Sequence, residues 1–101
     1  MSEPELPADP ILVGAIEQAR KIYEAVRDIW TGGDDEEARD AAEEAVTHAD
    51  NALTHLEHGR WDEADAAANL ALELEEEFGD GTIWRDFALL VEEAAAIGRT
   101  G

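Results

Sequence analysis

The sequence predicts an all-α protein that folds as a four-helix antiparallel bundle with up-down-up-down topology. Four segments place apolar residues at steps of three and four, the spacing of an amphipathic helix. No segment alternates with the period of two that a strand requires. The predicted helices cover about 10–30, 35–58, 62–77 and 83–97. Because only a few residues join them, consecutive helices are expected to be antiparallel neighbours.

One domain is expected, since a chain of 101 residues has enough apolar surface for a single modest core. Residues 1–8 contain two prolines and are predicted to be a flexible tail. The predicted four-helix domain therefore covers 9–101.

The first predicted helix has a clear start and a clear stop. Asp9 is a good N-cap, and Pro10 suits the first helical position. Thr31, Gly32 and Gly33 are expected to end the helix, because glycine adopts the left-handed conformation that follows a helix. This segment predicts an amphipathic helix of about six turns.

The second predicted helix is rich in alanine. Asp34, with Glu37 three residues later, resembles a capping box and predicts the start. Small side chains allow two helices to approach closely, so this helix is expected to pack tightly on a neighbour. The predicted apolar stripe consists of Ala38, Ala42, Ala45, Ala49, Ala52 and Leu56.

The third and fourth predicted helices complete the bundle. Thr82 is predicted to cap the fourth helix, and Gly98 to end it. The acidic run 73–77 is predicted to be solvated surface. The predicted buried stripe of the third helix consists of Ala64, Ala67, Ala71, Leu74 and Phe78.

The segment from Gly59 to Leu74 resembles one tetratricopeptide-repeat unit. Gly59, the run 61–64 (Trp-Asp-Glu-Ala) and the run 71–74 (Ala-Leu-Glu-Leu) match the corner and the second helix of that family. The resemblance implies a helical hairpin. A shift of 34 residues finds no second copy, and the concave peptide-binding surface of the family requires stacked units. The resemblance therefore implies no family binding residues.

The formal net charge of -19 is the strongest compositional feature. Such a charge repels nucleic-acid phosphates and anionic lipid, so neither nucleic acid nor membrane is an expected partner. Lys21 is the one lysine, and Asp, Glu and Ala are abundant. This composition is similar to that of proteins from salt-loving archaea, and a surface engineered for solubility would also have it.

The sequence contains no cysteine and no hydrolase, kinase or dinucleotide motif. It is therefore predicted not to be an enzyme, and no cofactor is expected. No apolar run approaches the roughly 20 residues that span a bilayer. The chain is expected to be soluble and cytoplasmic, as a monomer or a homodimer.

The three histidines form the one metal-binding hypothesis. His48 and His55 share a helix face, and His58 follows one turn later. His55 and His58 are candidate ligands because three-residue spacing brings two imidazoles within reach of one ion. The favoured interpretation is no metal site, with the histidines near a helix C-terminus where cations are stabilised.

Trp30, Trp61 and Trp84 each lie near a predicted helix end. They are predicted to close the ends of the bundle. Exposed tryptophans would instead mark a protein interface, so the three are also interface candidates.

Three functional hypotheses follow. The first is a structural scaffold without catalytic activity, which includes a de novo designed bundle with no natural function, because no polar residue falls at a predicted core position. The alternative is a natural acidic, halophile-like module that binds another protein. A distant alternative is a histidine-based metal-binding bundle.

Overall fold

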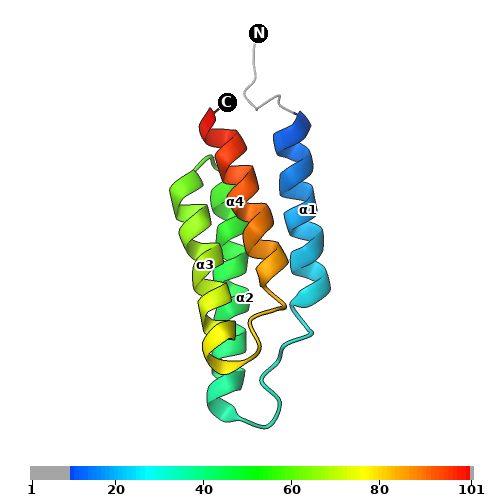
Figure 1. The fold of residues 1–101 in the computed structure, drawn as a ribbon, viewed down its shortest axis with the longest axis vertical. Coiled ribbons are helices and arrows are strands. Elements are labelled where there is room, and N and C mark those ends of the chain that lie inside the picture. Colours follow the sequence, from blue (N-terminus) through cyan, green and yellow to red (C-terminus); the bar gives the residue numbers. More distant parts are fainter. Residues whose placement is uncertain (1–9, 101) are drawn as a thin grey trace.

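The structure is a computed structural model that describes residues 10–100. The predicted tail 1–8 and the predicted cap Asp9 lie outside the described residues. Residues 10–100 contain four helices and no strand, in the arrangement that Figure 1 shows. The helices are α1 (Pro10–Val26), α2 (Glu36–Glu57), α3 (Trp61–Phe78) and α4 (Arg85–Thr100).

Consecutive helices run in opposite directions, which confirms the predicted all-α up-down-up-down bundle (Figure 1). α2 and α3 form the most extensive helix pair, and α4 packs on both α3 and α1. α1 contacts α4 more extensively than it contacts α2. α2 extends beyond the other helices at the end where the connection from α1 reaches it (Figure 1).

The α2–α3 interface is built from alanine, as the alanine-rich second helix predicts. Small side chains let two helix backbones approach closely, so a continuous row of alanines favours a tight pair. Larger side chains at these positions would force the helices apart. The alanines of these two helices in the buried core are Ala45, Ala49 and Ala52 in α2, and Ala64, Ala67, Ala68 and Ala71 in α3.

The bulky part of the core lies between α1, α2 and α4. The rings of Trp84 and Phe87 meet edge to face, with centroids 5.4 Å apart and planes at 82°. Tyr23 of α1 lies 6.2 Å from Trp84 and 6.3 Å from Phe87, measured between ring centroids. These rings bury large apolar areas in preferred relative orientations, and they join α1 to α4.

α1 ends earlier than predicted, at Val26 instead of about residue 30. The chain leaves the helix through a turn in which the amide of Ile29 donates to the carbonyl of Val26 at 3.0 Å. This exit carries Trp30 across to Gly79, where a Cβ would lie 2.9 Å from the indole Nε1. The apolar pattern of the first helix could not predict where α1 ends, because Trp30 contacts Gly79, a residue that follows α3 and is distant in the chain.

The start of α2 and the corner before α3 follow local rules. Asp35, not the predicted Asp34, is the N-cap of α2, and its side chain accepts from the Glu37 amide at 3.1 Å. Gly59 has φ 74°, the left-handed conformation that closes many helices. The amide of Arg60 donates to the His55 carbonyl at 2.9 Å. This corner turns the chain from α2 directly into α3.

Candidate functional site

Glu75 is the one buried charged residue in the described part of the chain, with 0% of its surface exposed. Its Oε2 accepts from the amides of Thr82 at 3.0 Å and Ile83 at 2.8 Å. Its Oε1 accepts from the amide of Trp84 at 2.7 Å. The prediction that the whole run 73–77 is solvated is therefore wrong at Glu75.

The same contacts overturn the prediction that Thr82 caps the fourth helix. The Glu75 carboxylate satisfies backbone donors at the start of α4, and a negative charge is stabilised at a helix N-terminus. Both carboxylate oxygens of Glu75 are engaged by peptide amides and no solvent reaches them. Glu75 therefore holds the α3–α4 connection and has no free oxygen for acid-base chemistry.

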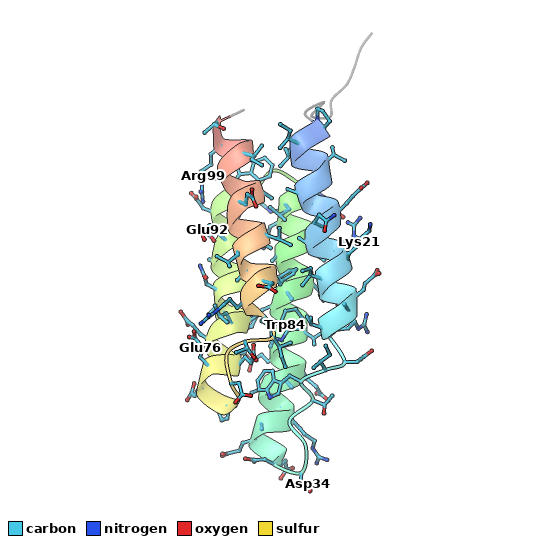
Figure 2. The ribbon with its side chains drawn as sticks, turned by 45° about the vertical axis from the view of Figure 1, so that its right-hand side comes forward. Lys21, Asp34, Glu76, Trp84, Glu92 and Arg99 are labelled. Carbon is cyan, nitrogen blue, oxygen red and sulfur yellow. The ribbon has the colours of Figure 1, made fainter. Side chains whose placement is uncertain are left out.

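The three tryptophans lie inside or against the bundle. Figure 2 shows Trp84 at the base of α4, where 1% of its surface is exposed. Its indole Nε1 is buried without a hydrogen-bond partner. Trp84 therefore offers no surface to a partner, which corrects its place among the interface candidates.

Trp30 and Trp61 are half-buried against glycines of other elements. A Cβ at Gly98 would lie 2.7 Å from Cδ2 of Trp61, so only glycine leaves room for this ring. The prediction that Gly98 ends the fourth helix is wrong, because α4 continues through Gly98 to Thr100. This burial fits tryptophans that close the ends of the bundle.

The hollow beside Trp30 has a mixed lining. It has a volume of about 530 Å³ and lies between the α1–α2 connection and α2. Arg27 and Arg39 line it together with Asp28, Asp40 and other acids. These opposing charges select neither an anionic nor a cationic ligand.

The candidate metal ligands His55 and His58 make protein contacts through their Nδ1 atoms. Nδ1 of His55 accepts from Nε of Arg60 at 2.9 Å. Nδ1 of His58 lies 2.8 Å from the Thr54 carbonyl and donates to it. Within residues 10–100, no group of three or more His, Asp or Glu side chains could hold a metal ion.

Tyr23 has a pKa raised from its ordinary value of 10.0. Burial is the largest cause, and the Asp50 carboxylate also raises this pKa, while the Arg27 guanidinium opposes the rise. The Arg27 guanidinium carbon lies 5.5 Å from the centre of the Tyr23 ring, a cation–π contact. Folding therefore favours the protonated phenol.

Tyr23 is the one tyrosine of the chain, so tyrosinate absorbance reports on this side chain alone. The folded protein holds the phenol proton where the unfolded chain releases it. The contribution of Tyr23 to stability is therefore fully present below pH 10 and is lost as the pH rises through the folded-state pKa. We expect a titration midpoint above 10 that falls in Asp50→Asn. The variant Glu92→Gln on α4 serves as the control. An unchanged midpoint in Asp50→Asn would show that the Asp50 carboxylate does not raise the pKa of Tyr23.

The outer side of α3 carries a row of apolar side chains that we call the α3 ridge: Leu70, Leu74 and Phe78. The residues are four positions apart and so share one helix face. Leu70 is 45% exposed, Phe78 is 37% exposed, and Leu74 is half-buried. An exposed row of large apolar side chains is a common mark of a protein interface.

The α3 ridge corrects the predicted buried stripe of the third helix. The stripe was expected to continue from Ala71 to Leu74 and Phe78, but the core position after Ala71 belongs to Glu75. Phe78 lies seven positions after Ala71 and so close to the same helix face, but it is the last residue of α3 and is 37% exposed. Apolar spacing alone could not predict the core position of Glu75, because the buried residue is an acid.

The surface around the α3 ridge is acidic. α3 contains no lysine or arginine among its 18 residues. Glu73 and Glu77 follow Leu70 and Leu74 by three positions each and are exposed. Glu76 also projects from α3 (Figure 2), but it lies two positions after Leu74 and therefore on a different face from the ridge. The chain's cationic side chains lie on other elements, such as Lys21 on α1 (Figure 2).

No protein-family model matches this sequence, and the comparisons with curated proteins and with solved structures give no match. The resemblance of the Gly59 hairpin to a tetratricopeptide unit therefore stays a prediction. None of the helices in the described part of the chain is long and apolar enough to cross a membrane.

Proposed function

We propose that this chain is an acidic, non-catalytic helical module that binds another protein. The observation that carries the proposal is the α3 ridge, which leaves Leu70 and Phe78 exposed beside carboxylates. Apolar side chains with a polar surround are typical of protein interfaces. The net charge of -19 disfavours nucleic acid and anionic membranes as partners.

Glu75 favours this proposal over an idealised bundle. The idealised interpretation depended on the agreement between apolar pattern and burial at every core position. A buried carboxylate in the core stripe of α3 breaks that agreement. Natural proteins commonly contain such exceptions, and they place them where a particular geometry is required.

A scaffold without a partner, natural or designed de novo, is the second candidate. Regular local structure favours the scaffold. Asp35 caps α2, Gly59 adopts the left-handed conformation between α2 and α3, and the connections are short. Such a scaffold would have no cofactor and no catalytic residue.

Selection of ligands from a random peptide library separates the two candidates. The binding module is expected to yield related peptides whose binding is lost in Leu70→Ser and retained in Leu89→Ser. Leu89 is the control because it is 56% exposed and lies on α4, not on α3. A selection without enrichment, or ligands indifferent to Leu70, would favour the scaffold.

A further inference from the structure

We infer that the partner segment that docks on the α3 ridge is a basic amphipathic helix. This inference rests on the proposed function and adds the chemistry of the partner. It is drawn from the shape of the ridge, from the charge around it, and from the like charge that a second copy of this chain would bring.

The α3 ridge suits a helix. From Leu70 to Phe78 it extends about 12 Å, at roughly 1.5 Å per residue. A partner helix with apolar residues at steps of three and four presents a matching row over two to three turns. Helix surfaces fit each other as ridges into grooves. Residues 10–100 offer no strand edge to which an extended peptide could add.

The charge around the ridge selects a basic partner. Two exposed acids, Glu73 and Glu77, flank the ridge, and α3 has no lysine or arginine. The acids at the start of the helix are distant from the ridge, and Asp62 and Glu63 pair there with Arg99 and Arg60. Lysine or arginine beside the apolar row of a partner would lie close to Glu73 and Glu77. Complementary charge of this kind accelerates encounter and rejects partners of the wrong sign.

The same charge disfavours a second copy of this chain on the ridge. Two copies of α3 would bring like charges together, and each copy carries a net charge of -19. Repulsion of this kind opposes association most strongly at low salt, where screening is weak. An acidic partner helix meets the same repulsion.

The test is a titration of the isotope-labelled full chain with three synthetic helical peptides, followed by amide chemical shifts. The first has a leucine row flanked by lysine and arginine. The second keeps the leucines and replaces the flanking cations with glutamate. The third keeps the cations and replaces the leucines with serine. We expect the first peptide alone to bind at low salt, with the largest shifts at Leu70, Leu74 and Phe78.

Two variants of the chain separate docking on the ridge from general attraction. The double variant Leu70→Ser, Phe78→Ser is expected to bind the first peptide at least about tenfold more weakly. This is the loss in affinity expected when buried apolar contacts are removed. Leu89→Ser makes the same leucine-to-serine change at an exposed position of α4 and should leave the affinity unchanged. Both replaced leucines are at the surface, and circular dichroism verifies that each variant is folded. Raising the salt concentration should weaken binding further.

Each other outcome overturns the inference. If the acidic peptide binds the ridge as well as the basic one, the partner is not selected by charge, while the proposed function survives. If the basic peptide binds equally to the Leu70→Ser, Phe78→Ser variant, the attraction is nonspecific. Concentration-dependent shifts at the ridge without peptide would identify a second copy as the occupant. If no peptide shifts the ridge, the inference fails, and the library selection alone decides the proposed function.

Discussion

Replacing Glu75 with alanine is expected to lower the free energy of unfolding by about 3 kcal/mol or more, because three amides lose a charged acceptor. Two of these amides, those of Ile83 and Trp84, lie in half-buried or buried residues where water replaces the carboxylate poorly. The start of α4 also loses a negative charge at its N-terminus. Urea denaturation followed by circular dichroism measures the change.

Matched variants separate the buried contact from general acidity. Glu76→Ala removes a neighbouring exposed carboxylate and is expected to change stability by less than about 0.5 kcal/mol. Glu75→Gln keeps the shape but retains one acceptor oxygen, so we expect a loss between those of the two alanine variants. Equal stabilities for Glu75→Ala and Glu76→Ala would show that the carboxylate does not hold the α3–α4 connection.

Gly32→Ala is the second large effect expected of a single substitution. Gly32 has φ +89°, and a Cβ there would lie 2.5 Å from the carbonyl carbon of Ala38 in α2. Helix backbone cannot move aside as a flexible side chain can, so the α1–α2 connection must leave its place. We expect a loss of about 3 kcal/mol, from left-handed strain together with the clash.

Gly33→Ala is the matched control for Gly32→Ala. Gly33 has φ +59°, but a Cβ at this position meets nothing within 4 Å. Only the left-handed strain remains, which costs about 1 kcal/mol. Thermal unfolding of both variants checks the difference. Equal losses for the two glycines would contradict the close packing of the α1–α2 connection on α2.

The fold could be predicted because the forces that form each helix are local. The Gly59 corner, the alanine rows and the acid before α2 act through neighbours in sequence, so their patterns predict the elements and their antiparallel order. The ends of α1 and α4 could not be predicted in the same way. They depend on Trp30 against Gly79 and Trp61 against Gly98, contacts between elements distant in the chain.

The candidate site was less predictable than the fold. Glu75 lies in a run of acids that gives no sign of burial, and its partners are the backbone amides of residues 82–84. Backbone donors leave no trace in the side-chain pattern. Leu70 and Phe78 are exposed, and with the half-buried Leu74 they form the α3 ridge.

Chemical-shift mapping of the full chain with a library-selected ligand shows directly whether the α3 ridge is the binding surface. We expect the largest amide shifts at Leu70, Leu74 and Phe78, and we expect Leu89→Ser to preserve them. Shifts centred on α1, or on the hollow beside Trp30, would contradict it.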